Sequence, residues 1–210
     1  MNQKIEEFLA WTTEKNRIYH RFNELATIFE NYISDSILTC GNDAKVAAER
    51  FADMLGKCNE LSIYDQPMAA DVYTMLHLLD RYYRLMRVYE LTIAQCAFPL
   101  NKKIKILDIG TGPAPALFAL SDITLFIKEY SKKEGYNDLT LDIIPDYVED
   151  SYSFRNWLHH FTEYANCKSY NGYWSVPYHH GSFSSFDELD FVKLNYNKAE
   201  WQDEQIYKKY

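Results

Sequence analysis

A chain of 210 residues in which 47% are hydrophobic is long enough to bury a sizeable core in one or two domains. Its formal net charge of -8 argues against binding to nucleic acid through a broad basic surface, which leaves only a local basic patch for that role. The four cysteines are scattered without a C-x-x-C pair, so we expect neither a zinc site nor a disulfide framework.

The N-terminus, MNQKIEEFLAW, carries acids where a signal peptide would carry basic residues. No apolar run approaches the roughly 20 residues of a membrane span. We therefore expect a cytoplasmic protein without a membrane partner.

Residues 1 to about 98 have the apolar spacing of helices throughout, which predicts an α-helical N-terminal domain over 1–100. A first apolar face runs from Ile5 to Ile33, and we expect it to end near Thr39–Asn42. A second helix is predicted over AKVAAERFADMLGKC. A long third helix is predicted from Asp65 and Pro67, with no breaker before Pro99.

Three arginines of the long predicted helix recur every third residue among tyrosines, at Arg81, Arg84 and Arg87. Arginine beside aromatic rings could hold a phosphate backbone and stack on bases. The alternative, which we favour, is a solvated face whose arginines pair with Asp80 and Glu90.

The stretch KIKILDIGTGPAPALFAL, Lys103 to Leu120, has the order of a strand, a tight turn and a helix. Glycines at 110 and 112 allow positive φ and let a ligand approach the backbone closely. Pro113 and Pro115 suit the first turn of a helix, where a missing N–H costs nothing. The N-terminus of that helix would face a ligand lying over the turn.

The run LDIGTGPAP resembles motif I of class I S-adenosylmethionine-dependent methyltransferases: an apolar strand, an acid, then G-x-G-x-G. The resemblance implies that Asp108, Gly110, Thr111 and Gly112 line the methionine end of the cofactor. The third glycine position holds Ala114, which we expect to crowd the loop slightly. A dinucleotide-binding loop is the nearest competitor, and a glycine turn in another α/β domain is the structural alternative.

The next apolar segment, residues 139–151, is predicted to be a buried strand that is interrupted by Pro145 and ends in Glu149 and Asp150. In the methyltransferase pattern, an acid at the end of the second strand accepts hydrogen bonds from both ribose hydroxyls. We choose Glu149 over Asp150 for this role, because it falls at the carboxyl edge of the predicted sheet. The candidate cofactor-binding residues are therefore Asp108, Gly110, Thr111, Gly112, Ala114, Glu149 and Asp150. The alternative is an acidic cap on the following helix, whose N-cap is expected at Ser151.

No metal site is predicted. His159 and His160 are adjacent, so they point about 100° apart on a helix and do not readily share one ion.

The tetrapeptide of amino-methylating DNA enzymes is absent, and no Pro-Cys nucleophile is present. The catalytic residues are therefore unknown.

Two further short strands are predicted at Tyr173–Val176 and Phe191–Leu194, which gives about four strands where the methyltransferase sheet has seven. We expect an α/β protein, in which a helical N-terminal domain precedes a partial Rossmann-like, S-adenosylmethionine-binding domain over 101–210. A homo- or hetero-oligomeric partner could complete the sheet, because an open edge invites pairing.

The resemblance implies a methyltransferase whose substrate is a nucleic acid, a protein or a small molecule. A helical N-terminal region that leads directly into motif I, followed by an acid-ending strand and the helix Ser151–Phe161, is broadly similar to the ribosome-associated Rsm22-like methyltransferases. A second hypothesis is a catalytically degenerate cofactor-binding or scaffold subunit that needs a partner chain. A third is a helical interaction module on an unrelated α/β domain.

Overall fold

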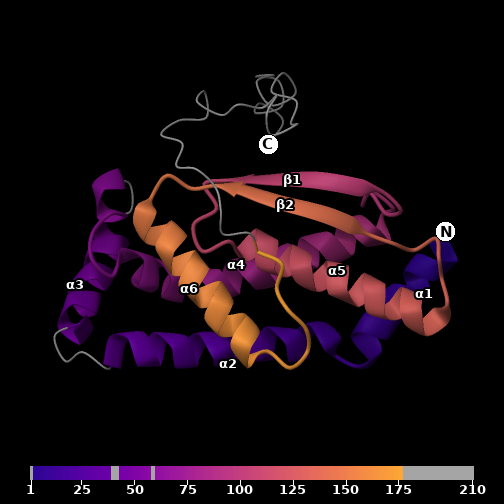
Figure 1. Ribbon diagram of the computed structural model, residues 1–210, viewed down its shortest axis with the longest axis horizontal. Helices are drawn as coiled ribbons and strands as arrows, with labels where there is room; N and C mark the ends of the chain where they lie inside the picture. The colour runs from indigo at the N-terminus through magenta and orange to yellow at the C-terminus, as the bar shows by residue number, and fades with distance from the viewer. Residues whose placement is uncertain (1, 39–42, 58–59, 177–210) are drawn as a thin grey trace, which may run out of the picture.

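The computed structural model describes residues 2–38, 43–57 and 60–176 (Figure 1). Over these residues the protein is mixed α/β and mostly helical. The elements in chain order are α1 (Asn2–Glu14), α2 (Arg17–Leu38), α3 (Asp43–Gly56), the short 3-10 helix η1 (Leu61–Ile63), α4 (Ala69–Ala94), β1 (Lys103–Ile109), α5 (Pro115–Glu134), β2 (Asp142–Val148) and α6 (Tyr152–Lys168).

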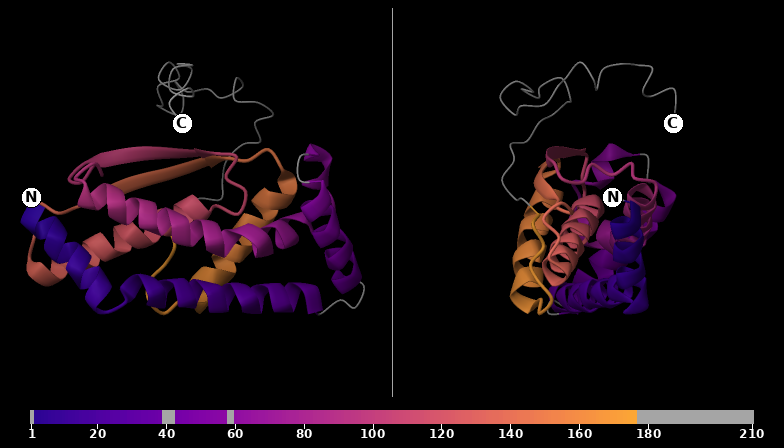
Figure 2. Two further views of the ribbon diagram at one scale, coloured as in Figure 1. Left: turned by 180° about the vertical axis from the view of Figure 1, so that it is seen from behind. Right: turned by 90° about the vertical axis from the view of Figure 1, so that its right-hand side faces the viewer.

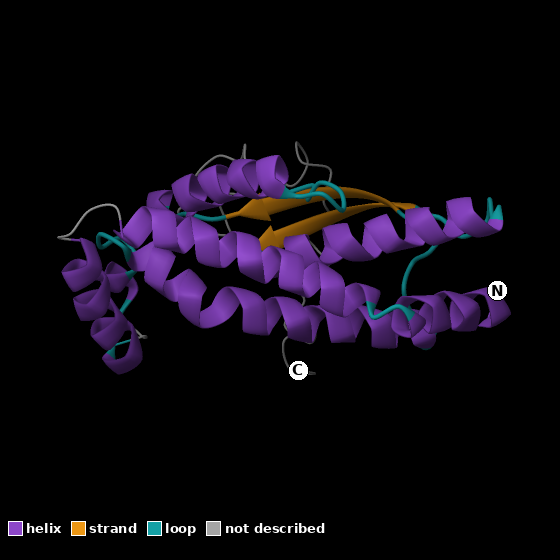
Figure 3. Cartoon of the chain, turned by 90° about the horizontal axis from the view of Figure 1, so that it is seen from below, coloured by secondary structure: helices purple, strands orange, loops and turns teal. Residues whose placement is uncertain are grey.

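The two strands lie along one side of the molecule, with α4 and α5 beneath them and α2 on the far side (Figure 1). Helix α6 crosses from the end of β2 toward α2, and the two further views in Figure 2 show the same layering. Seen from below, both strands are visible between the helices (Figure 3). The helices in the described part of the chain therefore lie on one face of the sheet.

Strands β1 and β2 are parallel and hydrogen-bonded, with Ile104 opposite Ile143 and Ile109 opposite Val148. Helix α5 is the crossover between them, as the strand–turn–helix pattern predicted. The observed second strand is shorter than the predicted 139–151 and contains Pro145. A proline fits here because each strand of a pair has an outer edge that needs no N–H donor.

One hydrophobic core joins helices from both sides of residue 100. Phe29 of α2 contacts Phe161 of α6 with ring centroids 5.8 Å apart, and Phe8 of α1 lies 5.6 Å from Tyr130 of α5. Apolar positions at helical spacing in the first helices are buried, as predicted. The division into domains at residue 100 stays a prediction.

Two helix boundaries differ from the sequence prediction. The first apolar face is split into α1 and α2 at Asn16, whose φ of 49° is left-handed. Asparagine tolerates this conformation better than most residues. Helix α4 begins at Ala69 rather than at Asp65, because Met68 before it is also left-handed, with φ 63°. The break predicted at Thr39–Asn42 lies outside the described residues.

The prediction of a strand at Tyr173–Val176 is wrong, since this segment pairs with no strand in the described part of the protein. Its backbone groups bond to side chains instead. The N–H of Trp174 donates to Asn166 Oδ1 at 2.8 Å, and the N–H of Ser175 donates to Ser121 Oγ at 2.9 Å. The strand predicted at Phe191–Leu194 lies outside the described residues.

Two of the three arginines of α4 form ion pairs on the helix surface, as favoured from the sequence. Arg84 donates to Asp80 at 3.0 Å, and Arg87 donates to Glu90. Arg81 instead donates to the hydroxyl of Tyr73 at 2.8 Å. Arg84 and Arg87 thus each have an acidic partner within the protein.

A buried charged network joins α2, α4, α5 and the segment after α6. Asp122 of α5 is fully buried and accepts hydrogen bonds from Arg21 Nε at 2.7 Å, Tyr82 Oη at 2.6 Å and Trp174 Nε1 at 3.0 Å. Arg21 also donates to Glu24 at 3.0 Å, and its guanidinium lies 3.6 Å from the centroid of the Trp174 ring. Burial raises the pKa of Asp122, and the charge of Arg21 opposes that rise.

Candidate functional site

The turn between β1 and α5 has the backbone that the sequence predicts. Gly110 and Gly112 have φ of 69° and 53°, and Pro115 is at the start of α5. Ala114, in the third glycine position, is fully buried and also left-handed, with φ 55° and ψ 41°. This conformation costs an L-residue about 1 kcal/mol or more, so the turn stores strain at the position where the sequence departs from motif I.

The acid before the turn, Asp108, is held by its own loop. Thr111 Oγ1 donates to Asp108 Oδ2 at 2.6 Å. Burial raises the pKa of Asp108, and this hydrogen bond partly opposes the rise. Burial and the nearby charge of Asp108 also raise the pKa of Tyr89, on α4, to about 12. The Asp108 side chain therefore supports the turn.

The second predicted acid lies where β2 ends and α6 begins. Glu149 is buried, and its Oε1 accepts the N–H of Ser151 at 3.1 Å. Ser151 is the N-cap of α6, as predicted, and its Oγ accepts the N–H of Phe154 at 3.5 Å. One oxygen of Glu149 thus bonds at the start of α6, which fits the capping alternative, and the ribose role stays a prediction.

The other oxygen of Glu149 joins the two loops directly. The N–H of Gly112 donates to Glu149 Oε2 at 2.7 Å, across 37 residues of sequence. Burial raises the pKa of Glu149, whereas the bonds from Gly112 and Ser151 lower it. The glycine turn and the acid after the second strand are thus adjacent, as parallel strands with carboxyl ends at one edge require.

A cavity of about 360 Å³ opens at this edge of the sheet. Four of the seven residues predicted to bind a cofactor line it: Gly110, Gly112, Glu149 and Asp150. Asp108, Thr111 and Ala114 do not line it and instead form the turn behind it. The volume lies in the range of small-molecule sites, which is about 300–1,000 Å³.

Three aromatic rings also line the cavity and were not singled out from the sequence as site residues. Tyr64 precedes α4 and Tyr73 lies near its start, and their ring centroids are 5.6 Å apart. Phe154 of α6 lies 5.3 Å from Tyr73 and 6.2 Å from Tyr64. Tyr64 and Tyr73 reach the glycine turn only through tertiary packing, so no local spacing could have indicated them.

The charge of the cavity is negative. Asp65, Glu149 and Asp150 line it, and no lysine or arginine is among its described lining residues. The nearby guanidinium of Arg155 donates to the backbone carbonyls of Glu149 and Asp150, at 2.6 and 2.8 Å. Aromatic faces and carboxylates both attract cations, so this site suits a ligand that carries positive charge.

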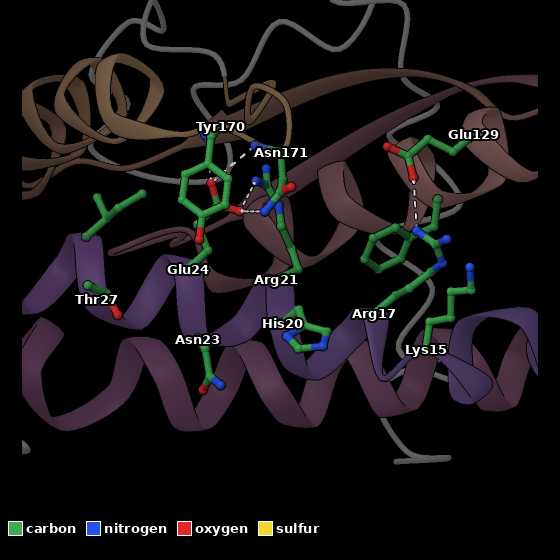
Figure 4. A pocket seen from close by; sticks show the side chains of 12 residues that line it. Lys15, Arg17, His20, Arg21, Asn23, Glu24, Thr27, Glu129, Tyr170 and Asn171 are labelled. Atoms are coloured by element: carbon green, nitrogen blue, oxygen red, sulfur yellow. Dashed lines mark hydrogen bonds and ion pairs between the residues drawn. The ribbon is translucent and has the colours of Figure 1, made fainter.

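A larger cavity, of about 550 Å³, lies between α2, α5 and the segment after α6 (Figure 4). At one end, Glu24 accepts hydrogen bonds from the N–H of Tyr170 at 2.9 Å and the side chain of Asn171 at 2.7 Å. Toward the other end of the cavity, Arg17 Nη1 lies 3.8 Å from Glu129 Oε2. No residue predicted to bind a cofactor lines this cavity, so the smaller one is the candidate site.

None of the described helices combines the length and the apolar character that crossing a bilayer requires. Comparison of the chain with protein-family models, curated proteins and solved structures finds no match.

Proposed function

We propose that this protein binds S-adenosylmethionine in the cavity at the end of the two strands and is a methyltransferase. The observation that supports this most is the 2.7 Å hydrogen bond from Gly112 N–H to Glu149. It puts the glycine turn of the motif I resemblance and the acid of the second strand against one cavity. In this proposal β1, α5 and β2 are the first unit of a Rossmann-like sheet.

The lining of the cavity favours S-adenosylmethionine over a dinucleotide. The sulfonium and the amino group of S-adenosylmethionine are cationic, which suits three aromatic rings and three carboxylates. Adenine could also stack on Tyr64, Tyr73 or Phe154. A pyrophosphate, in contrast, would meet Asp65, Glu149 and Asp150 without a cation from the described lining.

Glu149 has acceptor capacity left for a ribose. Each carboxylate oxygen can accept about two hydrogen bonds, and each oxygen of Glu149 accepts one from the backbone. The same two bonds fix the carboxylate before a ligand arrives, which lowers the entropy that binding must overcome. Methyl transfer is an in-line displacement, so the protein mainly has to align the acceptor and exclude water.

The proposal is tested by isothermal titration calorimetry of the full chain with S-adenosylmethionine, S-adenosylhomocysteine and NAD. Asp65→Asn and Asp150→Asn remove charge from exposed side chains of the lining. Each is expected to weaken S-adenosylmethionine binding about fivefold, the effect of about 1 kcal/mol. Asp142→Asn is the matched control, since Asp142 lies at the opposite end of β2.

The sulfur of S-adenosylhomocysteine is uncharged. If the aromatic rings and acids recognise the sulfonium, S-adenosylmethionine should therefore bind more tightly than S-adenosylhomocysteine. Binding of NAD in preference to both compounds would overturn the proposal, as would no binding at about 1 mM ligand. Binding with no methyl transfer to any acceptor class would instead favour the degenerate-subunit hypothesis. Mass spectrometry of the denatured protein gives an independent readout, a co-purified adenosyl compound.

A further inference from the structure

Three potential metal ligands meet on the solvent-facing side of α6. One ligand atom from each of His159, His160 and Glu163 lies within 4.8 Å of the other two. His159 Nε2 is 3.8 Å from Glu163 Oε2, and the two imidazole rings have centroids 5.3 Å apart. We predicted no metal site because adjacent histidines point about 100° apart on a helix. Their side chains are long enough to bring the ligand atoms together in spite of that angle.

These distances are close to those of a metal centre. In the tetrahedral geometry of zinc, with bonds of about 2.0–2.2 Å, two ligand atoms lie about 3.3–3.6 Å apart. Ligand atoms up to 4.8 Å apart therefore need to approach by up to about 1.4 Å, a movement that two rotating side chains can share. His160 and Glu163 are exposed and His159 is half-buried.

The backbone that carries the three side chains is firmly held. On its other face α6 buries Trp157, Leu158 and Phe161 in the main core. The rings of Trp157 and Phe161 stack with centroids 4.7 Å apart. The spacing of the ligand-bearing Cα atoms is therefore fixed before a metal binds, so binding requires no ordering of the backbone.

We propose that His159, His160 and Glu163 form a surface site for a divalent transition metal ion of the zinc type. Two imidazole nitrogens and one carboxylate oxygen suit Zn²⁺, Ni²⁺ and Cu²⁺. Ca²⁺ and Mg²⁺ are disfavoured, because they require mostly oxygen ligands. Three protein ligands leave at least one coordination position for water or for a group from another molecule.

The test is a Zn²⁺ titration of the full chain by calorimetry, with competition by a chromogenic chelator. His160→Ala and Glu163→Gln each remove one ligand and are each expected to weaken Zn²⁺ binding by about tenfold or more. The matched control is His20→Ala, because His20 is an exposed histidine on α2. A second control, His179→Ala with His180→Ala, removes the other adjacent histidine pair of the sequence.

The proposal requires that both controls bind Zn²⁺ as the wild type does, and that Ca²⁺ does not compete. It is overturned if the wild type binds no Zn²⁺, or if the His160→Ala and Glu163→Gln variants retain full affinity. It is also overturned if binding disappears with His179 and His180. Circular dichroism at each step checks that the exposed substitutions leave α6 folded.

Discussion

Replacing Asp122 with alanine is expected to destabilise the protein by about 4 kcal/mol. The substitution removes the acceptor of three buried donors, on Arg21, Tyr82 and Trp174. Breaking a buried ion pair from one side costs about 3–5 kcal/mol, and each neutral donor left unsatisfied costs about 1–3 kcal/mol. The total stays below the sum, because Arg21 keeps its bond to Glu24 at 3.0 Å.

The measurement is urea unfolding at neutral pH, followed by tryptophan fluorescence and far-ultraviolet circular dichroism. In a thermal unfolding experiment on a chain of this size, a loss of 4 kcal/mol corresponds to a drop of about 8–16 °C in the melting temperature. The control is Asp80→Ala, which breaks an ion pair of similar length, 3.0 Å to Arg84, between exposed side chains. That variant should lose less than about 0.5 kcal/mol.

The two variants together isolate burial as the cause of the large effect. A loss below about 1 kcal/mol for Asp122→Ala would refute the reasoning, because it would mean that water or rearranged groups replace the carboxylate. Equal losses for both variants would also refute it, since exposed and buried pairs would then contribute alike.

Two further predictions concern a glycine and a buried acid. Gly172→Ala should cost about 2 kcal/mol in chemical denaturation, because φ is +117° and a Cβ would lie 3.0 Å from Leu125 Cδ2. The control is Gly56→Ala, at the end of α3 with open space around it, which should be neutral or stabilise the protein by up to about 1 kcal/mol. A larger loss of stability for Gly56→Ala than for Gly172→Ala would contradict the argument from backbone strain at Gly172. Burial raises the pKa of Asp108, so the native state binds a proton at this carboxyl more tightly than the unfolded state does. The contribution of Asp108 to the free energy of unfolding therefore grows as the pH falls from neutral toward 3.8. In urea unfolding, Asp108→Asn should remove that part of the rise in stability between neutral pH and pH 3.8. An unchanged pH dependence would contradict the assignment.

The parts that were predictable from the sequence are those in which one residue determines its own backbone. Gly110 and Gly112 adopt positive φ, Pro115 starts a helix and Ser151 caps one, because local sterics and local hydrogen bonds decide these outcomes. Ala114 shows the limit of this logic. The alanine keeps the left-handed conformation of a glycine, since the surrounding turn imposes it.

The parts that were not predictable depend on contacts between distant residues. Tyr64 and Tyr73 carry no local signal for a cavity whose other wall begins at Gly110. Residues 173–176 alternate between exposed and buried as a strand does, with Trp174 and Val176 inside. The alternation is real, but side chains of other segments, such as Asn166, take the backbone hydrogen bonds, so no sheet forms there.

The side chain of Arg21 has a consequence for how the molecule melts. It links Asp122 on the crossover helix to the carbonyl of Gly172, 2.8 Å away, in the segment after α6. If α5 or the segment after α6 opened locally, the Arg21 guanidinium would lose hydrogen-bond partners although its side chain is only 2% exposed. The helices before residue 100 and the strand–helix unit after it are thereby coupled, and we expect calorimetry to record one cooperative transition rather than two.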